Sequence, residues 1–504
     1  MNVKFNSLEI KFENPKIHKT PDEKFQMIYV RELLSEGRLA NRVERLPSPV
    51  LMGMDKIRAK TLMGKYLVDF ASSSSIHGLN HMTAPRRHII ERFLAALFII
   101  AALASLILLS LTFWKRYQDD AIVIVLNHDY KHFTIKAPGV VICPQENVNE
   151  AIFPQVFKKY GLKDTIETRN FFRFISNATY ETFNQTPEFN AVDSSKWLAI
   201  LNDLKPNVVY RTFNNSKAKW IVTERGFCLT FNNYISPYSS FDYWENNSWT
   251  AISIPPEFPS YNYLKREITD QIRVKTHSVM LSIYPAGDVV NIKQKFYLCK
   301  RLSIVTIDVL VFEINSSDQV TQLSLRQRKC KFAEEGGLEM WPTYSLNACR
   351  LECTYKQIRK TCYCYPHFAR PTPGVPTCNA AQLRCIAANW TQISLSDKKA
   401  AEECGCIPNC NTARYVEASY SSLDLKEGSP NEAVVTPTVI FPTDKYERKQ
   451  IFGFNDFLAS VGGAAGLFLG ASVISFVEIF YFATLRLYWY KLKIINKVKQ
   501  KFNN

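Results

Sequence analysis

Two long apolar runs stand out from the mixed pattern of polar and hydrophobic positions along the chain. Residues 93–114 are 22 residues without a charge, and as an α-helix they would extend about 33 Å, slightly more than the hydrocarbon core of a bilayer. Residues 457–485 contain a single charged side chain, that of Glu478. The first run begins too far into the chain to be a cleaved signal peptide. We therefore predict two transmembrane helices.

Basic residues flank the two runs on the sides that face the chain termini. Arg86, Arg87 and Arg92 precede the first run, and Arg486, Lys491 and Lys493 follow the second. The positive-inside rule then places both termini in the cytoplasm, and we expect a multi-pass protein of the plasma membrane. The predicted organisation is a cytoplasmic N-terminal tail, a first transmembrane helix, an extracellular domain, a second transmembrane helix and a basic cytoplasmic tail, in residues 1–92, 93–114, 115–456, 457–485 and 486–504.

Cysteines and glycosylation sequons agree with that placement. All 13 cysteines lie in residues 143–410, and ten of them lie in residues 330–410. Disulfides and N-linked glycans both form on the oxidising, non-cytoplasmic side of a membrane. The six Asn-x-Ser/Thr sequons all lie in the predicted ectodomain, at Asn177, Asn184, Asn214, Asn246, Asn315 and Asn389.

Within the ectodomain, the alternation of apolar and polar residues favours strands. Residues 121–126 and 302–314 alternate as half-buried strands do, and the proline-rich residues 253–261 indicate a loop. Helical periodicity is weaker. We therefore predict an α+β membrane protein with a large, disulfide-rich and strand-rich ectodomain.

The net charge of +16 does not indicate nucleic-acid binding. Residues 1–92 carry 16 Lys/Arg and 10 Asp/Glu, and residues 486–504 carry six Lys/Arg and no acid, so each end contributes +6. The basicity therefore belongs to the tails, and no basic stripe with interleaved aromatic residues is present. No nucleophile–base pair or metal motif stands out either, so we expect neither an enzyme nor a metal site.

The spacing of four cysteines suggests a pairing. Cys349 and Cys353 would share one face of a helix that begins after an N-cap at Ser345, and Cys404 and Cys406 would share one face of a strand. Because four helical residues and two strand residues both rise about 6 Å, the pairs Cys349–Cys406 and Cys353–Cys404 would fit. The alternative is a zinc cluster on the two C-x-C pairs, which lack C-x₂-C spacing. Spacing alone leaves the connectivity open.

Small residues line one face of the second apolar run. Gly462, Gly466 and Gly470 are spaced four residues apart, with Ala459 above them. One interpretation is a packing face at which two helices approach closely. The other is that helices converge around an axis and break there, so that backbone carbonyls line a water-filled path.

Two carboxylates lie near the ends of this run. Asp456 is typical of a solvated residue at a helix start, with a charge at an outer pore mouth as the alternative. Glu478 follows 22 residues later, about 33 Å along a continuous helix, which places it near the inner headgroups. It is either a carboxylate at the interface or part of a ring of charges that concentrates cations at an inner pore mouth.

Several motifs occur in the order typical of one channel family. They are "FASSSSIHGLNHM" (70–82), "APGVVICP" (137–144), "GFCLTFN" (226–232), the ten-cysteine block and "GGAAGLFLGAS" (462–472). With these motifs the chain resembles the degenerin/epithelial sodium channel family, in the style of the arthropod pickpocket channels. It departs from the family pattern at Ala137 and Pro144, and it lacks the extra cysteine pair of acid-sensing channels.

The resemblance implies a fold and an assembly. Family members are trimers, and each subunit is a clenched-hand ectodomain on two helices, the second of which lines a cation pore. The implied partners are paralogous subunits in a homo- or heterotrimer and membrane lipid, with no cofactor beyond the permeant Na⁺. Cys299 would have no partner. The implied disulfides are Cys143–Cys228, Cys330–Cys410, Cys349–Cys406, Cys353–Cys404, Cys362–Cys385 and Cys364–Cys378.

The resemblance also assigns a selectivity filter. It makes Gly470, Ala471 and Ser472 the point at which the second helix breaks. Three copies of this segment would form a narrow ring whose oxygens replace part of the Na⁺ hydration shell.

Three further residues receive gating roles from the resemblance. His77 and Gly78 would belong to a re-entrant segment that lines the lower pore and controls opening. Ala459 matches the position at which a small side chain permits the closed gate. The leading hypothesis is a sodium-selective, amiloride-sensitive channel subunit gated through its ectodomain by an unidentified stimulus. The alternatives are a subunit that conducts only with a paralogue, and a receptor or adhesion ectodomain anchored twice.

Overall fold

The computed structural model describes residues 64–84, 87–212, 217–246, 259–264, 267–275, 277–426 and 430–502. The chain divides into two compact units, one formed by residues 1–100 and 473–504 and the other by residues 101–472. The sequon at Asn214 and the predicted tail up to residue 63 lie outside the described residues.

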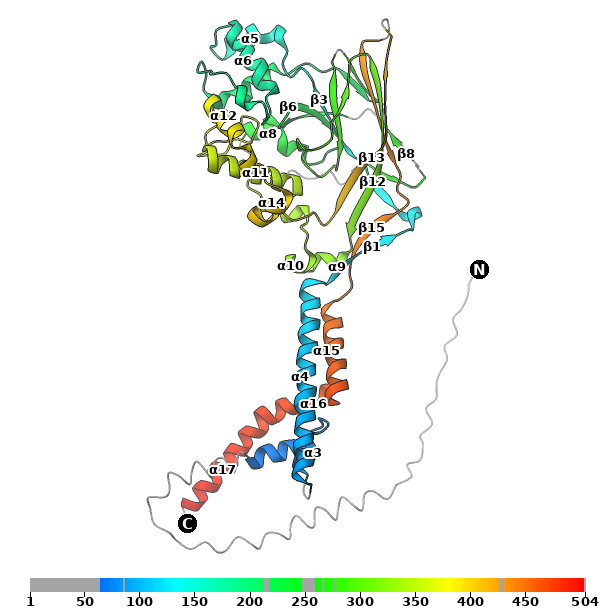
Figure 1. Ribbon diagram of the computed structural model, residues 1–504, viewed down its shortest axis with the longest axis vertical. Coiled ribbons are helices and arrows are strands. Elements are labelled where there is room, and N and C mark those ends of the chain that lie inside the picture. The colour runs from blue at the N-terminus through cyan, green and yellow to red at the C-terminus, as the bar shows by residue number, and fades with distance from the viewer. Residues whose placement is uncertain are drawn as a thin grey trace, which may run out of the picture. The chain divides into compact units, whose positions relative to one another are not determined.

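An eight-stranded sheet forms one side of the ectodomain (Figure 1). The longest strand of this sheet is β12. One edge of β12 pairs antiparallel with β13, and the other edge of β12 pairs in parallel with β14 and then with β15. The strands, in sheet order, are β1 (Ile122–Asn127), β15 (Lys445–Gln450), β12 (Ser303–Ser316), β14 (Glu432–Ile440), β9 (Ile272–Lys275) and β4 (Tyr210–Thr212), with β13 (Thr412–Asp424) on β12 and β8 (Glu267–Thr269) on β14.

A five-stranded sheet shares its core with the first. Ile142 and Leu281 of the five-stranded sheet belong to the same buried apolar cluster as Val305 and Ile307 of β12. A separate pair of short strands joins β2 (Thr134–Lys136) to β7 (Ser260–Asn262). The five strands, in sheet order, are β11 (Tyr297–Cys299), β10 (Val279–Tyr284), β3 (Gly139–Pro144), β6 (Gly226–Phe231) and β5 (Lys219–Thr223).

The strand predictions are confirmed for the two alternating segments, which form β1 and β12. The loop prediction for residues 253–261 is wrong at its end, because Ser260 and Tyr261 pair with β2. Most of that proline-rich segment lies outside the described residues.

Helices are more numerous in the ectodomain than the sequence pattern predicted (Figure 1). Many are short, so they span too few turns for a clear 3.6-residue period. They are α5 (Phe153–Lys159), α6 (Ile166–Asn177), α7 (Trp197–Leu204), α8 (Phe241–Glu245), α9 (Asp318–Thr321), α10 (Leu325–Arg328), α11 (Leu346–Cys362), α12 (Ala380–Ala388), α13 (Trp390–Ile393) and α14 (Asp397–Cys404). Single 3₁₀ turns occur at Tyr130–His132, Glu150–Ile152, Phe183–Gln185, Ser194–Lys196, Ser236–Ser239 and Ala333–Glu335.

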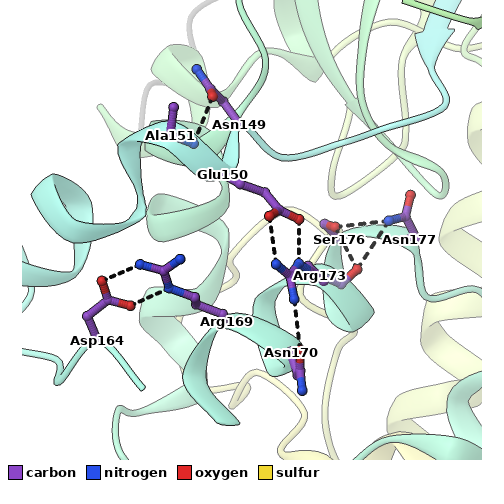
Figure 2. Close-up of polar contacts among 9 residues, drawn as sticks. All are labelled: Asn149, Glu150, Ala151, Asp164, Arg169, Asn170, Arg173, Ser176 and Asn177. Atoms are coloured by element: carbon purple, nitrogen blue, oxygen red, sulfur yellow. Dashed lines mark hydrogen bonds and ion pairs between the residues drawn. The ribbon is translucent and has the colours of Figure 1, made fainter. Parts of the chain in front are cut away.

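Two arginines of α6 bind the segments that precede it, as Figure 2 shows. Arg173 donates to Glu150, with Nη2 2.6 Å from Oε2, and Arg169 donates to Asp164 at 2.6 and 2.7 Å. The guanidinium of Arg173 lowers the pKa of Glu150 below its usual value. These pairs are partly exposed, so they contribute little to stability. They nevertheless fix the outer face of α6, whose inner face is held by buried aromatic rings such as Phe171 and Phe172.

Six disulfides form in the larger unit, and they are the six pairs that the resemblance implied. The bonds are Cys143–Cys228, Cys330–Cys410, Cys349–Cys406, Cys353–Cys404, Cys362–Cys385 and Cys364–Cys378. All four cysteines of the two C-x-C pairs are bonded in this way, so the zinc-cluster alternative is wrong.

The helix expected after Ser345 is confirmed, but the strand expected to face it is wrong. Ser345 caps α11 by accepting a hydrogen bond from the Ala348 amide at 3.1 Å. Cys404 is instead the last residue of a second helix, α14, which is capped by Ser396 and ends at Gly405 with φ +67°. A left-handed C-cap glycine turns the chain sharply, so Cys404 and Cys406 reach α11 without strand geometry.

The two apolar runs are helical. The first forms α4 (Ile89–Asp119), which is long and apolar enough to cross a membrane. The second forms α15 (Phe454–Leu469) and α16 (Val473–Tyr481), followed by a π-helical turn at Phe482–Arg486 and α17 (Leu487–Phe502). Residues 454–469 and 473–496 pass the same test only together, as an interrupted pair. Before α4, residues 64–73 are helical and α3 spans Leu79–Thr83.

Candidate functional site

The second apolar run is interrupted at the three residues expected to break it. Gly470 follows α15 with φ +61° and ψ 20°, a left-handed conformation that glycine adopts without steric cost. Its amide donates to the Gly466 carbonyl at 2.9 Å, and the Ala471 amide donates to the Ala465 carbonyl at 3.2 Å. These bonds end the helix as a glycine C-cap does. The assumption of one continuous helix from Asp456 to Glu478 is therefore wrong.

The glycine face has no neighbour in the described part of the chain. A Cβ built on Gly462 or Gly463 meets no atom within 4 Å, and one on Gly466 comes no nearer than 3.8 Å to the Ala471 carbonyl oxygen. Ala459 is exposed as well. This face is therefore exposed within the described residues.

Asp456 makes the contact of a helix-start residue. Its Oδ2 accepts a hydrogen bond from the Gly453 amide at 2.8 Å, which satisfies a donor at the N-terminus of α15. The helix macrodipole also favours a negative charge there. The interpretation of Asp456 as a helix-start residue agrees with this geometry.

In the smaller unit, the His-Gly motif lies in a turn that requires glycine. Gly78 has φ +92°, and a Cβ on it would approach the Ile99 side chain to 3.1 Å. His77 is exposed beside it, whereas Ser74 is buried. Any larger residue at position 78 would therefore both strain the backbone and press on α4.

Glu478 is held by the segment that carries this motif. Its Oε2 accepts hydrogen bonds from the Ser75 amide at 3.1 Å and from the Ser75 hydroxyl at 2.8 Å. The same hydroxyl lies 2.8 Å from that of Ser475, which is buried on α16. A carboxylate and two hydroxyls thus form one polar cluster, in which Glu478 lies next to the residues just before His77.

The helical residues 64–73 contact the π-helical turn. The Tyr66 hydroxyl donates to the Phe482 carbonyl at 2.5 Å, and both residues are buried. A π turn displaces the usual i→i+4 pattern and commonly frees a carbonyl, which Tyr66 satisfies. The Phe70 ring packs edge-on against Phe482 at 5.1 Å, and Asp69 pairs with Arg486 at 2.7 Å.

Sequence reasoning missed these contacts. Tyr66, Asp69 and Phe70 are spaced so that they share one helical face, and that spacing was the only local signal available. Their partners lie more than 400 residues away in the chain, so no local pattern connects the two segments.

In the larger unit, an aromatic cluster joins the end of α4 to the start of α15. Trp114 packs against Phe457 at 5.5 Å, and Tyr117 lies 6.0 Å from Phe457 and 6.2 Å from Phe454. Aromatic pairs of this kind add about 0.5–1.5 kcal/mol beyond the area they bury. Figure 1 shows α4 and α15 side by side at this level.

The ectodomain contacts the same end of α4 through α10. The Gln327 side-chain Nε2 donates to the Tyr117 carbonyl at 3.1 Å, and Arg326 pairs with Asp119 at 3.1 Å. Cys330, two residues after α10, is bonded to Cys410, two residues before β13. The disulfide-bonded part of the ectodomain thus touches the end of α4 directly.

Asp288 is a buried carboxylate at the N-terminus of α11. Its Oδ1 accepts from the Val289 amide and its Oδ2 from the Asn347 side chain, both at 2.8 Å. Burial nevertheless raises the pKa of Asp288 to about 6. This carboxyl therefore changes charge just below neutral pH.

Cys299 is unpaired and buried. Its thiol lies 3.6 Å from both the Ser303 hydroxyl and the Val434 carbonyl, and burial raises its pKa. A thiol that stays protonated is a poor nucleophile, so Cys299 acts as a core residue.

Among the sequons in the described residues, three asparagines are exposed and two are half-buried. Asn177, Asn184 and Asn246 are exposed, whereas Asn315 and Asn389 are half-buried. The Asn177 amide donates to the Arg173 carbonyl (Figure 2), and the Asn389 amide donates to the Cys385 carbonyl. The exposed sequons are the better acceptors for glycans in the folded chain.

Sequence comparisons with known proteins agree on one family. The profile described as amiloride-sensitive sodium channel matches residues 70–482. Pickpocket protein 19 of Drosophila melanogaster is 23% identical over 81% of this chain and 88% of its own length. Pickpocket protein 28 of the same organism is 22% identical over 86% of this chain and 80% of its own. Acid-sensing ion channel 1 of Gallus gallus is 23% identical, with 82% of each chain covered.

Proposed function

The chain belongs to the amiloride-sensitive sodium channel family, and on that premise we propose that it is a subunit of a sodium-selective, amiloride-sensitive cation channel gated through its ectodomain. The observation that carries the proposal is the family match across residues 70–482, which contain the first apolar run and residues 457–482 of the second, together with the break of the second run at Gly470. A helix that serves only as an anchor has no use for such a break, since glycine costs about 1 kcal/mol in a helix interior.

The proposed topology has two spans. Residues 93–114 form the first and residues 457–485 form the second, interrupted span, with both termini in the cytoplasm and residues 115–456 outside. The flanking basic residues, the sequons and the disulfides support this orientation. The proposed location is the plasma membrane.

The proposed assembly is a trimer of identical or paralogous subunits. The open face of Gly462 and Gly466 supports it, because small residues let neighbouring helices approach closely. The adjacent Ala459 would then lie where three helices converge. A side chain added there would press on its copies in the closed state.

The proposed filter is Gly470-Ala471-Ser472. Non-helical backbone at membrane depth is tolerated where it lines a water-filled path, and the last turn of α15 leaves carbonyls that no helical amide satisfies. Three copies of this segment would present oxygens to a partly dehydrated Na⁺ ion. Glu478, held by Ser75, would add negative charge on the cytoplasmic side.

The proposed gating path runs from the ectodomain to α4. The contacts of α10 with the end of α4, and the aromatic cluster between α4 and α15, would carry a displacement of the disulfide-bonded region to both spans. The stimulus is extracellular in this scheme. At the inner end, His77 and Gly78 would move with the segment that binds Glu478.

Expression of the chain in oocytes tests the function. Two-electrode recording under stretch, hypo-osmotic solution and acidification, each with and without amiloride, should reveal an amiloride-blocked inward Na⁺ current. Co-expression with a pickpocket paralogue distinguishes a homotrimer from an obligate heterotrimer. Normal surface labelling with no current under any stimulus, alone or with paralogues, would contradict the proposal and favour a receptor.

A further inference from the structure

Helix α17 presents an apolar strip on its surface. Tyr488, Leu492 and Ile495 follow one another at intervals of four and three residues, which places them on one helical face. Their exposed fractions are 61%, 39% and 50%, and Trp489 beside them is 70% exposed. Four exposed apolar side chains that adjoin one another on one helix form a patch of the kind that marks an interaction surface.

Lysines border this strip. Lys491 and Lys493 are exposed, and at 3.6 residues per turn they project on opposite sides of the line through Leu492. Lys497, Lys499 and Lys501 follow in the sequence, and residues 486–504 contain no acidic residue. An apolar strip between basic margins is typical of helices that lie in a membrane interface.

A different face of α17 is already occupied. The Tyr490 ring lies 4.9 Å from the Tyr66 ring, and Arg486 just before the helix pairs with Asp69. The helical residues 64–73 therefore cover that face. The strip around Leu492 lies on another face, and its Tyr488 and Trp489 rings are exposed.

We propose that α17 lies in the headgroup layer of the cytoplasmic leaflet and binds anionic phospholipids, with its strip at the acyl boundary and its lysines at the phosphates. Two observations favour lipid over a protein partner. The helix begins directly after the second apolar run, where tyrosine and tryptophan are enriched at membrane surfaces, and its charge is complementary to that leaflet. The proposal goes beyond channel activity and rests on the proposed cytoplasmic position of the C-terminus.

Hydrogen exchange on the full-length chain tests the contact. The chain is reconstituted into nanodiscs of phosphatidylcholine alone and of phosphatidylcholine with phosphatidylserine. Amides of residues 487–496 should exchange more slowly in the discs that contain phosphatidylserine. The variant K491Q/K493Q should lose that difference, whereas K398Q/K399Q, which removes the same charge from the ectodomain, should keep it.

A lipid titration measures how much each side chain contributes to phosphatidylserine affinity. Binding of a fluorescent phosphatidylserine to the chain in detergent should weaken about fivefold for each lysine removed, and about thirtyfold for K491Q/K493Q. The variant L492N/I495N should also weaken binding, because it removes the apolar part of the strip. Glycerophosphoserine, which carries the headgroup without acyl chains, should not displace the lipid.

Three results would overturn the proposal. They are equal exchange in both kinds of disc, protection that depends on protein concentration rather than lipid (a protein interface), and displacement by glycerophosphoserine (a soluble anion site). An epitope tag placed after Asn504 tests separately whether the C-terminus is cytoplasmic, as the proposed topology requires. If the tag is labelled from outside intact cells, the proposed orientation of the channel is wrong, whatever α17 binds.

Discussion

Removing one of the two nested disulfides between α11 and α14 should cost much less stability than removing both. Cys349–Cys406 and Cys353–Cys404 join residues 57 and 51 apart. With the inner bond intact, the outer bond closes a ring of only about eight residues, worth about 2.5 kcal/mol by chain entropy. When the second bond is also lost, a ring of about thirty residues opens, because Cys362–Cys385 shortens the loop between Cys353 and Cys404, and this costs about 3.6 kcal/mol more.

Thermal unfolding of the full-length chain, followed by fluorescence-detected gel filtration, measures this ordering. Cys349→Ser, Cys406→Ser and their double variant should all unfold at the same reduced temperature, because the second substitution removes nothing further. The variant C349S/C353S breaks both bonds and should unfold at a distinctly lower temperature. Surface biotinylation should fall in the same order, since folding is required for delivery.

Two outcomes would refute this reasoning. If the losses of Cys349→Ser and Cys406→Ser add in the double variant, the two residues are not partners. If C349S/C353S unfolds at the same temperature as C349S, the long loop is already constrained by other contacts, and loop entropy is not the source of the stabilisation. Cys299→Ser is a matched control, because that thiol is unpaired.

Three further predictions concern permeation, gating and pH. Ser472→Ala should reduce Na⁺ over K⁺ selectivity without loss of assembly, and an unchanged reversal potential in mixed solutions would remove residues 470–472 from the filter. Ala459→Val and Ala459→Phe should overpack the closed state by about 1–3 kcal/mol per misfit, enough to give a standing amiloride-blocked current, whereas Ala459→Gly should stay quiet; normal surface levels without standing current would exclude the gate role. The raised pKa of Asp288, about 6, means that the folded state binds its proton more tightly than the unfolded state, so this site's contribution to stability is present at low pH and is lost as pH rises through 6. Relative to Asp288→Asn, the wild-type chain should therefore gain about 2 kcal/mol between pH 7 and pH 4, and parallel unfolding profiles of the two chains would contradict this.

Sequence reasoning succeeded where a local pattern determines a local structure. The alternating residues of β1 and β12 form strands because each has one face to bury. Ser345 starts α11 because its hydroxyl satisfies an amide at the helix end. The disulfide pairs came from a family resemblance together with spacing, and both sources placed the same four cysteines together.

Sequence reasoning failed where two local rules competed or where the contact was distant. The spacing of Cys404 and Cys406 fits a strand, but Ser396 and Gly405 supply both ends of a helix, and those end signals prevailed. The contact of Tyr66 with Phe482 depends on a π turn, which has no reliable sequence signature. In the first case the helix start at Ser396 lay outside the window that the spacing used, and in the second the partner residue lay more than 400 residues away.

The break at Gly470 changes the basis for placing Glu478. In a continuous helix, the depth of this carboxylate would follow from residue count alone. Because α15 ends at Leu469, the position of Glu478 is set instead by contacts within the smaller unit. There the Ser75 amide and the Ser75 hydroxyl both donate to the Glu478 carboxylate. Ser75 lies two residues before His77, so the same contacts position the turn at Gly78. The proposed inner-mouth charge and the proposed gating segment, which the sequence presented as separate features, are therefore joined by hydrogen bonds. If this segment moves when the proposed pore opens, we expect the carboxylate to move with it.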